Sequence, residues 1–264
     1  MHSAVVCAIF VLAVSQVVVA LRARGGVSMV SKYISSKKPI FVAGGSKGVG
    51  MEVVKQLTGM GNPVKCLVRR RESADELKAI GGDLVTCQVG DAMDESDVQS
   101  CMEGCIAAVT TLGGKPETEG GKRVDYFGNS NVVEQAGILG CERIILVTSI
   151  GCGSTKDAIS EEVYKVLEDA LVAKNKAERD CRMYTNLDWT IIRPGGLKSE
   201  PATGSAVLTD DIKASGVINR ADVAALVIKA LESEGKATRK ELSALDPAAA
   251  SDHKAGAGYA AFEV

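Results

Sequence analysis

The sequence has few aromatic residues, few histidines and almost no net charge, and each shortage excludes a class of function. Phe, Trp and Tyr make up 4% of the 264 residues, and 31 Lys and Arg nearly balance 33 Asp and Glu. A nucleic-acid-binding protein needs a basic face or a stacking platform, so that class is excluded. The two histidines, His2 and His253, lie near the ends of the chain, which excludes a histidine base. Function must therefore come from a local site.

No acidic residue occurs before Glu52, and this absence sets the N-terminal segment apart. The apolar run from Val5 to Ala20 is too short for a comfortable membrane span and ends abruptly at two arginines, so it resembles the core of a signal peptide. A basic, serine-containing stretch follows it. We predict that residues 1–38 are a signal plus transit-like address into the stroma of a plastid of secondary origin. Simple secretion and a retained membrane anchor are the alternatives, and no membrane span is expected in the mature chain.

A disulfide framework and a metal site are also missing. Seven of the eight cysteines lie outside the leader, an odd and scattered set, and no Asn-x-Ser/Thr sequon occurs. Secreted disulfide scaffolds are more often even and clustered, so a reducing compartment is favoured. Cys101 and Cys105 have neither a histidine nor a second cysteine pair nearby, and metal ligation is not predicted.

From Pro39 onward, short apolar runs alternate with longer amphipathic ones, the pattern of repeated β-α units around a parallel sheet. The expected strands are Ile40–Ala43, Val64–Val68, Leu84–Val89, Ala107–Thr111, Arg143–Thr148, Trp189–Ile192 and Glu241–Ala244. The expected helices are Gly50–Leu57, Ser73–Ile80, Glu95–Met102, Asn129–Ala136, Glu161–Tyr184 and Ala221–Glu232. We predict an α/β fold with a doubly wound, mostly parallel sheet over residues 39–246, a small C-terminal substrate region and a flexible tail over 247–264.

In doubly wound sheets, ligands bind outside the carboxyl ends of the strands, where the strand order reverses. The segments that follow the strands are therefore the candidates for a site. The longest of them without clear periodicity runs from Gly195 to Gly216, and long loops of that kind are often binding elements.

The segment after the first strand, in the stretch "FVAGGSKGVG", holds four glycines within seven positions and opens a helix. Glycine suits a tight turn in which a pyrophosphate approaches the N–H groups at a helix start, where the helix dipole favours an anion. We predict a dinucleotide cradle, although a plain strand-to-helix turn is the alternative. Its residues are Gly44, Gly45, Ser46, Lys47, Gly48, Val49 and Gly50.

The segment after the second strand favours NADP(H) over NAD(H). NAD-binding versions carry an acidic residue there for the ribose hydroxyl, whereas an arginine accommodates a 2′-phosphate. This chain has Arg69, Arg70 and Arg71 and no acid until Glu72. Any one exposed arginine can be merely solubilising, but together with Lys47 they predict a 2′-phosphate site. Asp91, after the third strand, is predicted either to meet the adenine or to cap the next helix.

Seven motifs of this chain occur in the order, and at about the spacing, of the atypical short-chain dehydrogenase/reductases. The chain therefore resembles this NmrA-like NAD(P)-binding group, which has plastid and cyanobacterial members. The motifs are "FVAGGSKGVG", "VGDAMD", "VDYFGNSNVVEQA", "RIILVTSIGCG", "AKNKAE", "LDWTIIRPGGL" and "INRADVAALVIKAL". The resemblance covers Pro39 to Asp246 and implies a Rossmann fold that binds NADP(H). The resemblance does not identify a substrate, because the group contains reductases, redox sensors and assembly factors. It also implies cofactor contacts at Thr111, Pro194 and Gly195.

The glycine loop departs from the pattern of the atypical group. Gly-x-x-Gly-x-x-Gly is usual there, but Lys47 stands where the middle glycine is expected. The spacing of Gly44, Gly48 and Gly50 instead resembles the loop of the typical short-chain dehydrogenases. In that branch, a basic residue just before the second glycine accompanies a preference for NADP(H), so this departure strengthens the predicted cofactor.

A second departure concerns chemistry. In active members of the wider family, a Tyr exchanges the proton, a Lys four residues later lowers its pKa and holds the nicotinamide ribose, and a Ser after the fifth strand orients the substrate. Ser149 and Lys174 match the Ser and the Lys, but the Tyr position is Ala170. Tyr164 lies out of register, about 15 Å below Lys174 along a straight helix. Ser149 can also be a plain strand-end hydroxyl.

Two functions follow from an intact cofactor set beside a missing Tyr. The first is an NADP(H)-dependent reductase of a small-molecule acceptor that can take its proton from water, such as a quinone, a flavin or a conjugated tetrapyrrole. The second is a non-catalytic NADP(H)-binding redox sensor or assembly factor of a plastid protein complex. A sugar-nucleotide epimerase is a weaker third, because it needs the Tyr and a larger C-terminal region.

Overall fold

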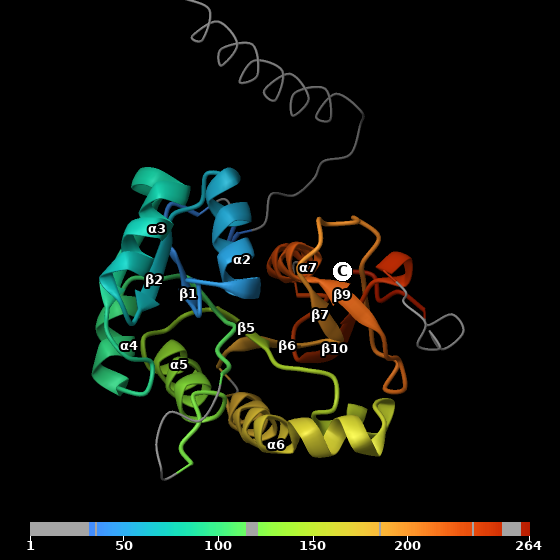
Figure 1. Cartoon of the computed structure of the whole chain (residues 1–264). Helices are drawn as coiled ribbons and strands as arrows, with labels where there is room; N and C mark the ends of the chain where they lie inside the picture. Colours follow the sequence, from blue (N-terminus) through green and yellow to red (C-terminus); the bar gives the residue numbers. More distant parts are fainter. Residues whose placement is uncertain (1–31, 35, 115–120, 185, 234, 250–259) are drawn as a thin grey trace, which may run out of the picture. The chain divides into compact units, whose positions relative to one another are not determined.

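The structure, a computed structural model, describes residues 32–34, 36–114, 121–184, 186–233, 235–249 and 260–264 (Figure 1). Most of the predicted address, residues 1–31 and 35, and most of the predicted tail, residues 250–259, lie outside the described residues. The described residues belong to one compact unit that runs from Ser31 to Val264. In the part of this unit that the structure describes, no helix is both long enough and apolar enough to cross a membrane.

An eight-stranded sheet forms the centre of this unit. In order across the sheet, its strands are β3 (Val85–Val89), β2 (Val64–Val68), β1 (Ile40–Ala43), β4 (Ala107–Thr110), β5 (Arg143–Val147), β6 (Asp188–Pro194), β10 (Lys240–Leu245) and β8 (Val207–Thr209). All neighbours are parallel except β10 and β8. The strand order reverses between β1 and β4, so the predicted doubly wound α/β fold is confirmed.

Helices cover both faces of the sheet. α2 (Gly48–Gly59), α3 (Arg71–Gly81) and α7 (Arg220–Glu232) pack on one face, and α4 (Glu95–Met102), α5 (Phe127–Ile138) and α6 (Glu161–Met183) pack on the other. The sequence dictates this arrangement because successive residues of a strand point to opposite faces. Ile40 and Val42 of β1 contact the first group of helices, and Phe41 and Ala43 contact the second.

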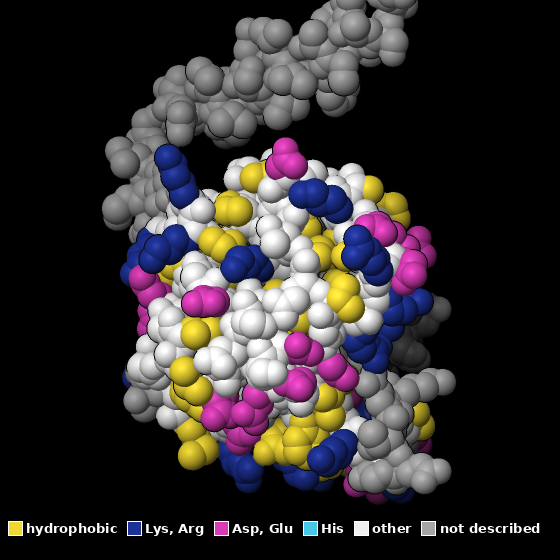
Figure 2. Space-filling view, turned by 90° about the vertical axis from the view of Figure 1, so that its left-hand side faces the viewer, with side chains coloured by type: hydrophobic (Ala, Val, Ile, Leu, Met, Phe, Trp, Pro, Cys, Tyr) yellow, Lys and Arg dark blue, Asp and Glu magenta, His cyan; other side chains and the backbone are white. Residues whose placement is uncertain are grey.

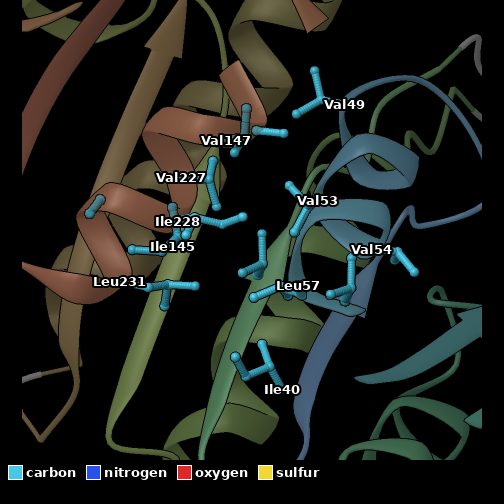
Figure 3. Close-up of a cluster of buried hydrophobic side chains, with 14 of the residues drawn as sticks. Ile40, Val49, Val53, Val54, Leu57, Ile145, Val147, Val227, Ile228 and Leu231 are labelled. Carbon is cyan, nitrogen blue, oxygen red and sulfur yellow. The ribbon is translucent and has the colours of Figure 1, made fainter. Parts of the chain in front are cut away.

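Apolar side chains form the core between α2, α7 and the sheet (Figure 3). Val49, Val53 and Leu57 recur every four residues along α2 and therefore lie on one face of the helix. They point toward Val227 and Leu231 of α7 and the strands beneath. Because an Ala substitution at a buried Leu costs about 2–5 kcal/mol of stability, this core fixes where α2 begins relative to β1.

The segment from Gly195 to Gly216, for which no regular structure was expected, contains two short strands. β7 (Gly196–Lys198) pairs in parallel with β9 (Val217–Asn219) as a separate two-stranded sheet, and β8 adds to the edge of the main sheet. The expectation of an unstructured loop is therefore wrong. Strands of three residues are too short to produce a periodic pattern in the sequence.

Both ends of the described chain contact the core. Tyr33 and Ile34 are 8% and 9% exposed and belong to the cluster beneath α2 and α7. Lys32 forms an ion pair with Glu142. At the other end, the backbone N–H of Phe262 donates a 2.7 Å hydrogen bond to the carbonyl of Leu208 in β8, and the Phe262 side chain packs against the same core.

Surface charge follows the balance of the composition. On the face of the molecule in Figure 2, Lys and Arg side chains share the surface with Asp and Glu side chains and with apolar ones. Neither sign covers that face alone. Selectivity for a charged ligand must therefore come from a few side chains around a site.

Candidate functional site

The glycine loop between β1 and α2 adopts a conformation that requires glycine. Gly44 and Gly48 have φ angles of 79° and 60°, in the left-handed region that L side chains rarely adopt. Gly50 is buried in the first turn of α2, and a Cβ there would lie 2.2 Å from the carbonyl oxygen of Gly44. The first two glycines thus allow the turn, and the third allows α2 to approach the end of β1.

Thr111 lies directly beneath this loop. Its N–H and its hydroxyl each donate a 3.1 Å hydrogen bond to the carbonyl of Ala43, which ties the end of β4 to the end of β1. A Cβ at Gly44 would approach the Thr111 hydroxyl oxygen to 2.7 Å, and one at Gly50 would approach it to 2.6 Å. Thr111 therefore supports the loop from the sheet side.

The N-terminus of α2 is available to an anion. The residue before the helix is Lys47, and its side chain makes no capping hydrogen bond. The first turn of α2 contains no acidic residue. A Cβ placed on Gly48 would have only the Arg220 side chain within 4 Å, so the space above this glycine is open. Unpaired N–H groups, the helix dipole and open space are what a pyrophosphate needs, so the site fits a dinucleotide.

Arg220 is a second cation at this site, and the sequence did not single it out. It is the first residue of α7, and its guanidinium Nε lies 3.8 Å from the position of a Cβ on Gly48. Its Nη1 donates a 2.7 Å hydrogen bond to the Ser199 hydroxyl. A hollow of about 450 Å³ opens beside it, and its lining consists of Gly48, Glu52, Ser199, Glu200, Pro201, Arg220 and Ala221. The motif "INRADVAALVIKAL" contains this arginine, but nothing in its spacing predicted the proximity to Gly48.

At the opposite end of the predicted site, Arg69 and Arg70 are exposed directly after β2. Arg70 precedes α3 in an extended conformation, so the arginines stand at the carboxyl edge of the sheet. Asp91 does not cap α4. Asp94 does so by accepting hydrogen bonds from the N–H groups of Ser96 and Asp97, and the Asp91 carboxylate instead accepts one from the N–H of Met93 at 2.9 Å. Its contact with an adenine stays a prediction.

Lys174 and Ser149 have different hydrogen-bond partners. The Lys174 ammonium lies 3.1 Å from the Asp125 carboxylate and donates a 3.0 Å hydrogen bond to the carbonyl of Leu112, just after β4. The Ser149 hydroxyl donates to the carbonyl of Ile150 at 2.9 Å. Asp125 is almost fully buried and also accepts a 3.3 Å hydrogen bond from the N–H of Gly114. The structure thus joins Lys174 to the β4 edge of the site.

The position one helical turn before Lys174 cannot transfer a proton. It is Ala170, on the same face of α6 as Lys174, and its side chain is a methyl group. Tyr164 remains in the first turns of α6, where the Lys156 ammonium lies 4.7 Å from the centre of its ring. The helix therefore presents the ammonium of the usual catalytic pair without the phenol.

Beneath Lys174 lies a buried cluster of charges that the sequence did not predict. Glu178 is fully buried on α6, and its carboxylate accepts hydrogen bonds from Arg193 Nε at 2.9 Å, Arg193 Nη2 at 2.7 Å and the Thr148 hydroxyl at 2.7 Å. Arg193 Nη2 also contacts Glu241 of β10 at 2.5 Å, and Arg182 bonds to Glu241 at 2.7 Å. These contacts join α6 to β5, β6 and β10, and hence fix Lys174 relative to Pro194 and Gly195.

The charges in this cluster stabilise one another. Burial lowers the pKa of Arg193, but its hydrogen bonds and charge contacts with Glu178 and Glu241 outweigh burial, so the pKa lies above its usual value. Burial raises the pKa of Glu241, and the Arg182 hydrogen bond and the Arg193 charge outweigh it in turn, so the pKa of Glu241 is lowered. Arg193 and Glu241 are therefore both charged near neutral pH, and their contact acts as a rigid support.

These features define a dinucleotide-binding protein of the doubly wound class. They are a glycine turn before an open helix N-terminus, cations at both ends of the carboxyl edge of the sheet, and a lysine on α6. Residues 44–234 match the sequence family described as NAD(P)H-binding, and the chain belongs to this family. The predicted resemblance to NAD(P)-binding Rossmann proteins is confirmed, and so is a nicotinamide dinucleotide as the cofactor of the family.

Several known proteins are similar over most of their length. The chain is 30% identical over 205 residues to YhfK of Bacillus subtilis, named an uncharacterized sugar epimerase, covering 76% of this chain and 91% of YhfK. It is 33% identical over 208 residues to the chloroplastic protein At2g34460 of Arabidopsis thaliana, with coverages of 75% and 73%. The structure of ChuY, an anaerobillin reductase from Escherichia coli O157:H7, matches with a TM-score of 0.70 and 30% identity, over 83% of this chain and all of ChuY.

A more distant relative matches a smaller part. The photosystem II assembly factor Ycf39 of Trieres chinensis is 28% identical over 111 residues, which are 42% of this chain and 34% of Ycf39. Relatives of this chain thus include chloroplast proteins.

Proposed function

We propose that this chain is an NADP(H)-dependent reductase that transfers hydride to a conjugated acceptor, such as a quinone, a flavin or a tetrapyrrole, which takes its proton from water. The observation that carries the proposal is an open dinucleotide site with Lys174 in place and Ala170 where the proton donor would be. A conjugated acceptor spreads the negative charge that hydride delivers, so it needs little general-acid catalysis. The similarity to ChuY, a reductase, supports the same chemistry.

The residues present would hold the cofactor along the strand edge. The N–H groups at the start of α2 would bind the pyrophosphate, with Arg220 as a counter-charge. Arg69 and Lys47 would bind a 2′-phosphate, because arginine matches the geometry of a phosphate and lysine adds a point charge. NADPH, when bound, supplies the hydride.

Lys174 would orient the nicotinamide end. Asp125 holds its ammonium at the carboxyl end of β4, and the buried Glu178–Arg193 pair one turn further along α6 prevents the helix from shifting. In this position the ammonium can donate hydrogen bonds to ribose hydroxyls without an adjacent phenol to activate. We therefore expect Lys174→Ala to weaken NADPH binding, and Ala170→Tyr to leave reduction of a quinone within about threefold of the starting rate.

The test is NADPH oxidation by the chain from Ser31 onward, followed by the loss of NADPH absorbance with a panel of quinones, flavins and linear tetrapyrroles. We expect turnover with at least one acceptor and a rate that falls by at least about tenfold in Lys174→Ala. A flat trace across the whole panel, with NADPH bound, would overturn the reductase and leave only the binding function.

A non-catalytic function is the second candidate, and the similarity to Ycf39 favours it. Here the chain binds NADP(H) as a redox sensor or assembly factor of a plastid complex, and Ala170 marks a lost activity. The measurement is the size of the native species in plastid extracts. Co-migration with a large membrane complex, together with NADPH binding and no turnover, would support this candidate over the reductase. A sugar epimerase, the function in the name of YhfK, is not proposed because Ala170 cannot exchange the proton.

We also propose a plastid location, on the basis of the chloroplastic relative and the composition of residues 1–38. A fluorescent protein carrying these residues should enter the plastid of an organism with a secondary plastid. Export from the cell would contradict the proposal and favour simple secretion.

A further inference from the structure

Two cysteines face each other across neighbouring strands beneath the glycine loop. Cys66 of β2 is the direct register partner of Cys87 of β3. Neighbouring strands are about 4.8 Å apart, and partners in a parallel pair point to the same face of the sheet. A disulfide needs Cα atoms about 4.4–6.8 Å apart, so this pair meets the distance requirement without a change of backbone path. Both thiols are free in the structure.

The two thiols are hydrogen-bonded to each other and differ in character. The hydrogen bond lowers the pKa of Cys87, as does the nearby charge of Lys78, although partial burial opposes this change. The same hydrogen bond and burial raise the pKa of Cys66, which is fully buried. Cys87 is partly exposed. Cys87 is thus the thiol that an oxidant reaches first, with Cys66 in place to react second.

The other described cysteines have the opposite character. Burial raises the pKa to about 11 in Cys101 and Cys141 and to about 12 in Cys105, Cys152 and Cys181. All five are buried. Among the cysteines that the structure describes, reactivity therefore concentrates on one pair.

This pair touches the predicted cofactor site. The Sγ atom of Cys66 lies 3.1 Å from the position of a Cβ on Gly45, so the sulfur supports the glycine loop from below. β2 ends at Val68, directly before Arg69. A bond that draws the Cys66 sulfur toward Cys87 therefore removes this support from the glycine loop at the predicted cofactor site.

We propose that Cys66 and Cys87 form a reversible disulfide in response to peroxide, and that this disulfide weakens the binding of NADP(H). In the first step, the Cys87 thiolate attacks one oxygen of hydrogen peroxide, the O–O bond breaks, and the released hydroxide takes a proton to form water, leaving a sulfenic acid on Cys87. The Cys66 sulfur then attacks the Cys87 sulfur, the S–S bond forms, and the departing hydroxide leaves as water with the Cys66 proton. A dithiol restores both thiols. The effect on NADP(H) rests on the proposed function, whereas the disulfide does not.

The experiment treats the full-length chain with hydrogen peroxide, blocks the remaining thiols and digests it with trypsin and Asp-N without reduction. Cleavage gives residues 66–69 and residues 83–90, each with one cysteine, so their cross-link is unambiguous. We expect this cross-link in the native chain, its loss in Cys87→Ser and its retention in Cys101→Ala. A fluorescence titration should show that NADPH binds at least about fivefold more weakly after oxidation and recovers with dithiothreitol, with no such change in Cys87→Ser.

Each outcome tests a separate part of the proposal. Absence of the cross-link in the native chain overturns the proposal. A cross-link with unchanged NADPH affinity overturns the effect on the cofactor and leaves the disulfide. A reduced chain that binds no NADPH contradicts the proposed function instead, and the cross-link still reports on the cysteine pair.

Discussion

At the scale of single residues, the site depends on close backbone approach. Gly50 illustrates this, because its backbone lies against the carbonyl of Gly44 and the hydroxyl of Thr111 with no room for a methyl group. The same α2 helix contains Gly59 in its last turn, where an added Cβ would meet nothing within 4 Å. One helix therefore offers a glycine that the site requires and a glycine that it does not.

Gly50→Ala should lower the free energy of unfolding by about 1–3 kcal/mol, because the added methyl forces α2 away from β1. NADPH affinity should fall by at least about tenfold. In Gly59→Ala, stability should stay equal or rise by up to about 1 kcal/mol, because alanine favours the helix. Urea unfolding and NADPH titration measure both effects. Equal stability of the two variants would contradict the close packing at Gly50.

The predicted 2′-phosphate site is tested by comparing two cofactors. Replacement of Arg69 and Lys47 by Gln should weaken the binding of NADPH by about tenfold or more. It should change the affinity for NADH by less than about threefold, because only NADPH carries the 2′-phosphate. Lys165→Gln, on the exposed surface of α6, is the matched charge control and should change neither. Equal losses for NADPH and NADH would refute the assignment.

At the scale of elements, the buried Glu178–Arg193 pair joins α6 to the sheet. Glu178→Gln should lower the free energy of unfolding by about 3–5 kcal/mol, because it leaves a buried arginine without its main counter-charge. The control lies on the same helix: Glu161 pairs with Lys165 on the surface, and Glu161→Gln should cost less than about 1 kcal/mol. Chemical denaturation distinguishes the two. A small loss in Glu178→Gln would show that water reaches the cluster.

Glu241 in the same cluster predicts a pH dependence. Because its folded-state pKa is lowered below the ordinary value of 4.5, its contribution to stability is complete above that value. The contribution is lost as the pH falls through the lowered folded-state pKa. The stability difference between the native chain and Glu241→Gln should therefore be constant near neutral pH and shrink below pH 4.5. A difference that stays constant on acidification would contradict the pairing with Arg182 and Arg193.

At this scale the sequence predicted the long elements well and the short ones poorly. Every predicted strand and helix is present with bounds that agree within two residues, because apolar periodicity over a buried strand or a helix face is strong. β7, β8 and β9 were missed, since three residues carry no periodicity. The Glu178–Arg193–Glu241 cluster was missed for a different reason: its members come from three elements, and only the folded sheet brings their charges together.

In the site too, local features could be predicted from the sequence and contacts between distant elements could not. The glycine loop is encoded locally, so its conformation could be predicted from spacing, whereas Arg220 reaches Gly48 only because α7 packs beside α2. Lys174 was predicted as a site residue, but its contact with Asp125 exists only because the fold brings the segment just before α5 beside α6. Local patterns thus identified where a ligand binds, and tertiary packing decided which side chains surround it.

At the scale of the whole molecule, the core extends into the segment predicted as an address. Tyr33 and Ile34 are buried, so a chain that starts at residue 39 lacks two large core side chains. We expect such a chain to be less stable than one starting at Ser31 by about 3–6 kcal/mol, since each buried large side chain contributes about 1.5–3 kcal/mol. Urea unfolding of the two chains measures this, with NADPH titration as a control for the site. Equal stability would place the start of the folded unit at Pro39.

Phe262 makes its hydrogen bond on the outer side of β8, the last strand of the sheet. Without it, the carbonyl of Leu208 would be free to pair with a strand of another molecule, which is how sheet edges begin aggregation. Residues 260–264 therefore cover part of this sheet edge. A preparation that has lost them to proteolysis should become less soluble, because the edge of β8 is then uncovered.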